Sequence, residues 1–260
     1  MKFLVKKNYI IFILFSVFFV QTPSLGIENK VKYSSKNISN YFLGIISSKN
    51  HYTQDAYKYL NKVKLLKNKH TQYNSEFIRT LVITEKFDEA FNFSKEVWSE
   101  DILLFEADLL IGLDYFLKRD YYNAEKYFIR LNKISEYNFF FNDFVGNILL
   151  AWSRAAENKQ DESLDFLKKI PKSYNHLTRI QNAFLGCYFN DQETLKNFKE
   201  IINDNNYNFS RYNFFLINYL VHNNSLKDID NILQEGRKEN YSNLLIKQTE
   251  RFFYNKENQK

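Results

Sequence analysis

Along most of the chain, apolar residues recur in helix-length segments that short polar connectors separate from one another. The chain has only 2 prolines and 6 glycines, and because these residues punctuate strands and turns, their scarcity favours helix. The segments group in twos, which predicts consecutive helix pairs. The expected pairs are 38–49 with 53–67, 71–84 with 87–98, 102–118 with 121–134, 138–157 with 160–169, 175–189 with 191–203, and 208–223 with 226–238. A last expected helix, 241–255, has no partner.

A small residue recurs at one place in these pairs. Ala56, Ala90 and Ala124 are spaced 34 residues apart, and Gly44 and Gly112 stand twelve residues before the first and the third. Where two antiparallel helices cross, small residues let the backbones approach, so these positions are expected to be close contacts. Later equivalents follow at intervals of 39, 31 and 35 residues: Ser163, Thr194 and Ile229. A period of 20–50 residues is typical of a stacked repeat array.

The stretch IGLDYFLKRDYYNAEKYFIRL (111–131) resembles the tetratricopeptide repeat (TPR), whose pattern is W-x2-L-G-x2-Y, then A-x3-F, then P. The matching residues are Gly112, Tyr115, Ala124 and Phe128. Asp108 replaces the family's Trp, and no Pro follows at the usual place. The resemblance extends over about residues 38–240. It implies an all-α fold, a right-handed α-solenoid of about six TPR-like helix hairpins plus a C-terminal helix. The layout also resembles secreted bacterial TPR-repeat proteins of unassigned role.

In a TPR superhelix the first helix of each pair lines a concave groove. The family places groove residues three before, one after and four after the Gly-equivalent site. In this chain these positions include the partner-binding candidates Tyr41, Ile45, Arg79, Leu109, Leu113, Phe116, Ile148 and Trp152. Such a surface suits an extended peptide or an amphipathic helix. The other interpretation, which stays open here, is that these residues pack against neighbouring helices in a tight coil.

The N-terminus has the layout of a secretory signal peptide. Lys2, Lys6 and Lys7 precede the apolar segment YIIFILFSVFFV (9–20), and a short polar stretch follows it. We therefore predict a signal peptide at 1–26, a linker at 27–37, the α-solenoid at 38–260, and a periplasmic location. The alternative is that residues 9–20 stay uncleaved and anchor the chain to the inner membrane. This apolar segment is short for a membrane span, which needs about 20 residues.

No arrangement of residues that is typical of catalysis stands out. The four histidines, His51, His70, His176 and His222, have no metal-ligand spacing, and the single cysteine, Cys187, lies in an apolar segment. We therefore expect no catalytic residues, no metal and no cofactor. The net charge is +6, and without residues 1–26 there are 33 basic and 30 acidic residues. This balance is too mild to indicate a nucleic-acid partner.

Together these observations predict an exported, non-enzymatic TPR scaffold that mediates protein–protein interaction, with a role in assembly of the cell envelope. Its partner would be a protein or peptide held in the concave groove. The alternative is that the chain is the TPR-bearing accessory region of a longer envelope enzyme or complex. The unpaired segment 241–255 motivates that alternative, because it can be read as half of a further repeat.

Overall fold

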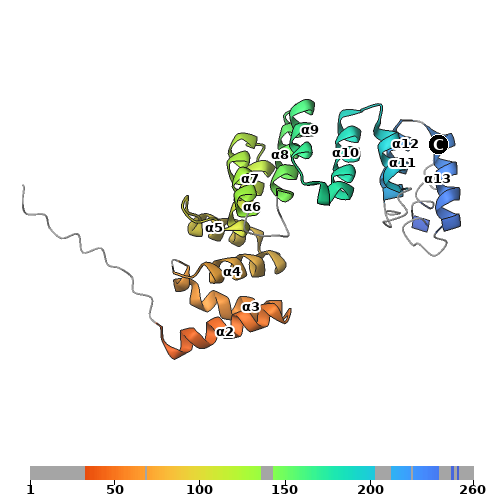
Figure 1. The fold of residues 1–260 in the computed structure, drawn as a ribbon. Helices are drawn as coiled ribbons and strands as arrows, with labels where there is room; N and C mark the ends of the chain where they lie inside the picture. The colour runs from red at the N-terminus through yellow and green to blue at the C-terminus, as the bar shows by residue number, and fades with distance from the viewer. Residues whose placement is uncertain are drawn as a thin grey trace, which may run out of the picture.

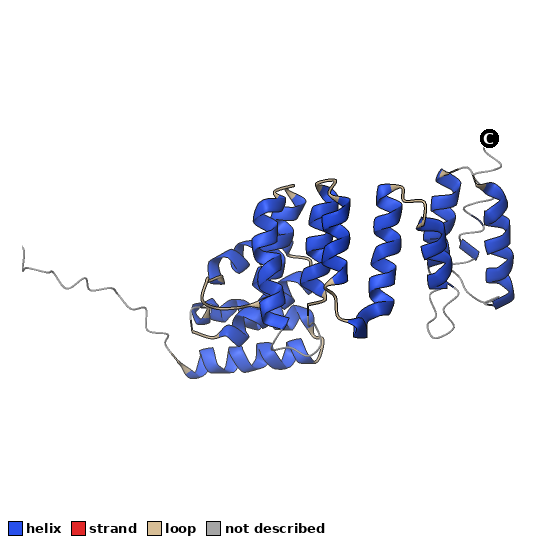
Figure 2. Ribbon diagram, turned by 45° about the horizontal axis from the view of Figure 1, so that its top comes forward, coloured by secondary structure: helices blue, strands red, loops and turns tan. Residues whose placement is uncertain are grey.

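The structure is a computed structural model that describes residues 33–67, 69–135, 143–202, 212–223 and 225–239, together with 247, 248 and 251. Within these residues it contains twelve α-helices and no strand, which confirms the all-α fold (Figure 2). The helices are α2 (Ser35–Lys49), α3 (Thr53–Leu60), α4 (Thr71–Ile83), α5 (Phe87–Val97), α6 (Phe105–Leu117), α7 (Tyr121–Ser135), α8 (Val145–Ala156), α9 (Gln160–Lys168), α10 (Asn175–Phe189), α11 (Thr194–Ile202), α12 (Tyr212–His222) and α13 (Leu226–Glu239). Two short 3-10 helices are η1 (Asn61–Leu66) and η2 (Lys172–Tyr174).

The helices pack as six consecutive pairs, from α2–α3 to α12–α13, and the pairs follow one another in an arc (Figure 1). The predicted α-solenoid is therefore confirmed. Each pair also contacts the next one, so the core is a succession of hydrophobic clusters along the array. Among the first helices, α2 contacts α4, and α4 contacts α6. These three helices therefore lie side by side and form a continuous surface, which we call the inner surface.

Several helix ends differ from the expected ones. The first helix begins at Ser35 instead of 38, because the side chain of Ser34 caps it by accepting a hydrogen bond from the Asn37 N–H at 3.2 Å. The expected helix 53–67 changes to 3-10 geometry after Leu60, and Val63 has a non-helical backbone (φ −120°, ψ 29°). The predicted signal peptide and the C-terminal helix 241–255 lie outside the described residues, apart from three single positions of that helix.

The small residues of the repeat lie where paired helices touch. A Cβ atom added to Gly44 would lie 2.6 Å from Cδ2 of Leu60, and one added to Gly112 would lie 2.5 Å from Cε1 of Phe128. Ala56, Ala90 and Ala124 are almost completely buried. Their equivalent in the fourth pair is Ser163, which is buried and donates a hydrogen bond to the carbonyl of Ala151 at 2.8 Å. The serine hydroxyl is therefore hydrogen-bonded at the point where the two helices cross.

The turns inside the first five pairs share one backbone geometry. Each turn contains a residue in the left-handed region, with φ between 55° and 63°: His51, Glu85, Arg119, Asn158 and Asn190. At the third turn, the Arg119 N–H donates to the Phe116 carbonyl (2.9 Å) and the Asp120 N–H to the Tyr115 carbonyl (3.0 Å). The same two bonds occur at the other four turns, and together they make a Schellman motif that closes the first helix.

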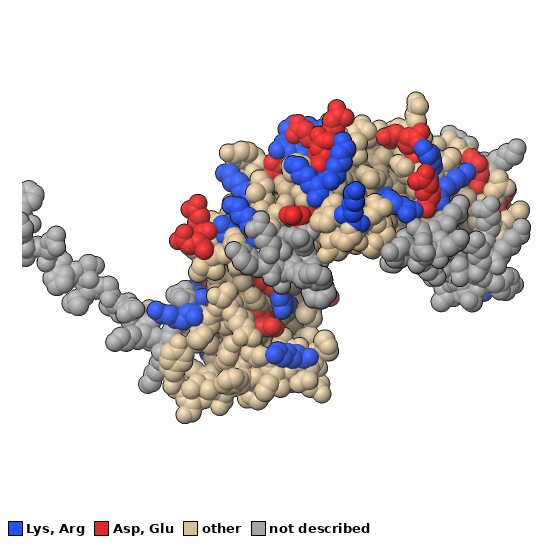
Figure 3. Space-filling model, in the orientation of Figure 1, with Lys and Arg blue, Asp and Glu red and all other residues tan. Residues whose placement is uncertain are grey.

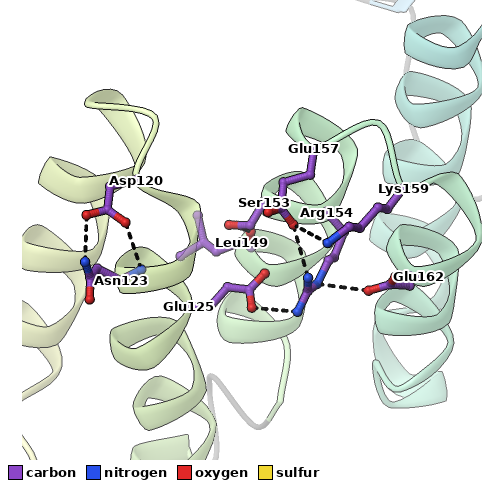
Figure 4. Close-up of polar contacts among 9 residues, drawn as sticks. All are labelled: Asp120, Asn123, Glu125, Leu149, Ser153, Arg154, Glu157, Lys159 and Glu162. Carbon is purple, nitrogen blue, oxygen red and sulfur yellow. Dashed lines mark hydrogen bonds and ion pairs between the residues drawn. The ribbon is translucent and has the colours of Figure 1, made fainter.

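Ion pairs on α8 connect the third pair of helices to the fourth. The Arg154 guanidinium lies 2.7 Å from Glu125 on α7, 3.1 Å from Glu157 after α8 and 3.2 Å from Glu162 on α9 (Figure 4). Lys159 adds a second cation, 3.1 Å from Glu157. Burial raises the pKa of Glu125, while the positive charge of Arg154 opposes that rise. This cluster joins three successive helices by charge as well as by apolar packing.

Candidate protein-binding surface

A cavity of about 690 Å³ opens on the inner surface between α4 and α6. We call it the α4–α6 cavity. Its walls are mostly apolar, and the apolar side chains include Ile78, Val82, Leu104, Phe105, Leu109 and Leu110. Ser75 and Arg79 on α4 and Glu106 on α6 add polar groups to the lining. A concave, largely apolar site with a few polar groups is the usual form of a binding site.

Polar side chains join α2, α4 and α6 across the inner surface. The Ser48 hydroxyl donates to Oε2 of Glu76 at 3.0 Å, and Arg79 lies 3.5 Å from the other oxygen of Glu76. Nε of Arg79 then donates to Oε1 of Glu106 at 2.7 Å. The two glutamates are largely covered, whereas the Arg79 side chain is 56% exposed. Arg79 is therefore held in place next to the cavity while its guanidinium still meets solvent.

The eight predicted binding residues fall into different environments. Arg79 and Leu109 line the α4–α6 cavity. Ile45 is only 8% exposed and belongs to the hydrophobic core of the first two pairs, where the half-buried Tyr41 packs against it from the same helix. Burial and the negative charge of Glu76 raise the pKa of Tyr41.

The other four predicted residues pack partly against their own hydrophobic clusters. Leu113 and Phe116 are half-buried against the cluster around Phe128, and Ile148 and Trp152 against the cluster around Ala151. The Trp152 indole N–H donates to Oε1 of Gln181 at 2.9 Å, which ties α8 to α10. The structure therefore gathers two of the eight residues in the α4–α6 cavity and distributes the rest along the array.

Sequence reasoning missed the part of the cavity wall that precedes α6. Leu103 and Leu104 lie in the connector between α5 and α6, and Ile134 comes from α7. A register counted from the glycine-equivalent position of each first helix reaches neither a connector nor a second helix. The available signal was the apolar sequence ILLF at 102–105, directly before the third pair.

A buried ion pair fixes this connector. Asp108 is completely buried, and its Oδ1 accepts hydrogen bonds from Nε of Arg130 (2.8 Å) and from the indole N–H of Trp98 (2.9 Å). Arg130 also donates to the backbone carbonyls of Ser99 and Glu100, and to that of Ile102, at 2.9–3.0 Å. Burial raises the pKa of Asp108, and the bonds from Arg130 and Trp98 oppose that rise. The aspartate that stands at the Trp position of the TPR pattern thus holds the wall of the cavity in place.

The described residues contain no group of three or more His, Cys, Asp or Glu side chains that could hold a metal ion. Cys187 is half-buried, and burial raises the pKa of its thiol. In the part of the chain that the structure describes, no helix is both long and apolar enough to span a membrane.

Comparison with known proteins gives limited similarity. No family model and no curated protein matches the chain. One similar solved structure is described as "MamA D159K mutant 1", with 16% sequence identity, 64% of this chain and 95% of that chain covered, and a TM-score of 0.48. Another is described as "Structure of Naa15/Naa10 bound to HypK-THB", with 12% identity and a TM-score of 0.30; the match covers 83% of this chain and 38% of that one. The fold assignment rests on the helix pairs and turns described above.

Proposed function

We propose that this chain is a non-enzymatic, TPR-like scaffold that binds another protein on its inner surface. The observation that carries the proposal is the α4–α6 cavity, an apolar hollow with Arg79, Glu106 and Ser75 in its lining. Most of its walls belong to regular helices, and the ion pair between Asp108 and Arg130 holds its connector. A preformed site lowers the cost of ordering that binding would otherwise require.

The bound segment is an extended peptide or an amphipathic helix that places one or two large apolar side chains in the α4–α6 cavity. Its polar groups meet the exposed guanidinium of Arg79, which Glu76 on the same helix and Glu106 on α6 hold in place. Specificity then comes from this polar row, and most of the affinity comes from burying apolar surface.

The proposal includes export. Residues 1–26 act as a signal peptide, 27–37 as a linker before the α-solenoid at 38–260, and the mature protein works in the periplasm in assembly of the cell envelope. N-terminal sequencing of the protein recovered from cells tests this part. A start at Ile27 supports cleavage, whereas a start at Met1 means that residues 9–20 are retained.

A cavity-filling variant tests the binding surface. Ser75 is half-buried in the cavity lining, so Ser75→Trp should fill the site. Asn92 is exposed on α5, away from the cavity, so Asn92→Trp is the matched control. Affinity capture from cells, read by mass spectrometry, should give at least one protein that Ser75→Trp loses and Asn92→Trp keeps. Circular dichroism should show that both variants keep their helix content. If Ser75→Trp retains every partner at wild-type strength, the cavity is not the binding site.

A further inference from the structure

The outward side of α2 carries a row of exposed apolar side chains. Ile38, Phe42 and Ile46 are spaced four residues apart, so they follow one another along one side of the helix, and Leu43 stands next to them. Their exposed fractions are 44%, 57%, 54% and 44%. The main contacts of α2 within the described chain are to α3, η1 and α4, which bury residues such as Gly44 and Ile45. We call the exposed side of this helix the α2 outer face.

This face is unusual for the end of a repeat array. A terminal repeat normally presents a polar outer side, because nothing stacks on it and an uncovered apolar surface reduces solubility. Single exposed apolar residues need no explanation, but several neighbouring ones mark an interaction site. The face lies on the outward side of α2, whereas the α4–α6 cavity lies between the next first helices, so the two surfaces are distinct.

The charged side chains of α2 are all positive. There is no Asp or Glu between Asn29 and Gln54, whereas Lys36 and Lys49 are exposed in the first and last turns of α2. The acids on the elements that pack against α2 are Asp55, in the first turn of α3, and Glu76, which is bonded to Ser48 on the inner surface. In Figure 3 the region of α2 and α3 is mostly uncharged surface, and the acidic side chains gather over the later helices.

We propose that the α2 outer face docks on the surface of a bilayer that contains anionic lipids. The apolar row then lies at the boundary between headgroups and acyl chains, and Lys36 and Lys49 meet lipid phosphates on either side of it. A helix with exposed aromatic and aliphatic residues between lysines is the form that lies in a membrane interface.

A second copy of the chain is a poorer occupant of this face. A symmetric contact between two α2 helices would bring the lysines of one copy next to those of the other. The face itself has no carboxylate to neutralise them. Lipid phosphates supply the opposite charge that the two lysines lack within α2, so charge complementarity favours the bilayer.

A tryptophan at the centre of the face reports its contact with lipid. The full-length chain with Phe42→Trp is mixed with phosphatidylglycerol vesicles that contain brominated lipid, which quenches tryptophan that enters the acyl region. The matched control is Tyr122→Trp, at a position on α7 that is 72% exposed. After subtraction of the wild-type emission from Trp98 and Trp152, the signal of the Phe42→Trp probe should be quenched roughly twofold or more relative to that of the control probe. Because the probe lies on α2, its quenching reports docking of this helix whether or not residues 9–20 enter the bilayer.

Charge reversal tests the role of the two lysines. Lys36→Glu with Lys49→Glu, in the Phe42→Trp background, should lower partition of this face onto anionic vesicles by roughly 20-fold or more. Equal quenching of the Phe42→Trp and Tyr122→Trp probes would overturn the proposal. So would equal quenching in phosphatidylcholine vesicles, because headgroup charge would then have no role. A concentration-dependent dimer that shields the Phe42→Trp probe without lipid would assign the face to a second copy and would also overturn it.

Discussion

At the scale of single residues, the turns inside the helix pairs use left-handed backbone without glycine. His51, Glu85 and Arg119 are spaced 34 residues apart, and each stands five residues before the small residue of its second helix. A side chain with a Cβ atom costs about 1–2 kcal/mol in this conformation. The close helix contacts at Gly44 and Gly112 can be predicted from the sequence, because glycine is recognisable there as a small residue. The sequence does not reveal these turn positions, because His, Glu and Arg share no property that indicates positive φ.

Arg119→Gly should therefore stabilise the protein. Glycine adopts φ of 62° without steric cost, but it also loses more backbone entropy on folding, so the free energy of unfolding should rise by about 0.5–1 kcal/mol. Urea unfolding followed by circular dichroism measures the change. Arg119→Ala is the matched control, since it removes the same side chain and keeps the strained conformation. An equal gain in both variants would mean that the Arg119 side chain, and not the backbone, is the cause.

At the scale of helices, the close approach of α6 and α7 depends on the pair Gly112 and Phe128. Gly112→Ala should lower the free energy of unfolding by about 1–2 kcal/mol, because the new methyl group would overlap the Phe128 ring. The higher helix propensity of alanine, about 1 kcal/mol, acts in the opposite direction. A net loss of stability would therefore mean that the packing conflict outweighs the gain in helix propensity.

The first helix pair has a smaller residue in the place of Phe128, and this difference suggests a control for Gly112→Ala. Leu60 stands opposite Gly44, where Phe128 stands opposite Gly112. The double variant Gly112→Ala with Phe128→Leu should lose less stability than the sum of the two single variants, because leucine gives the methyl group space. Chemical unfolding of the three variants completes this cycle. Additive losses would show that residue 112 does not contact residue 128 tightly.

Helix pairs were predictable from the sequence, and the candidate site was predictable only in part. The pairing follows from local features, such as the 34-residue spacing of Ala56, Ala90 and Ala124 and the scarcity of proline. The α4–α6 cavity depends on contacts between residues far apart in the chain, above all the pair of Asp108 and Arg130. The sequence does not indicate a partner for an aspartate at the position where the TPR pattern has Trp. Its role becomes visible only when α7 brings the guanidinium next to it.

At the scale of the whole molecule, each helix pair packs mainly against its neighbours, so a local defect should stay local. Asp108→Asn leaves the guanidinium of Arg130, which is only 14% exposed, without its charged partner. We expect the free energy of unfolding to fall by about 1–3 kcal/mol, since Arg130 keeps its bonds to three backbone carbonyls. Amide hydrogen exchange should become faster in α6, in α7 and in the connector before α6.

The locality of that change separates a repeat array from a domain with one shared core. Exchange in α12 and α13 should match the wild-type protein, because α12 packs against α13 and α11, far along the array from α6 and α7. Asp88→Asn, at an exposed position in the first turn of α5, is the matched control and should leave exchange near Asp108 unchanged. Faster exchange along the whole chain in Asp108→Asn would contradict the nearest-neighbour description. Leu103 and Leu104 of this connector form part of the wall of the α4–α6 cavity, so a confined change would show that this part of the wall depends on Asp108.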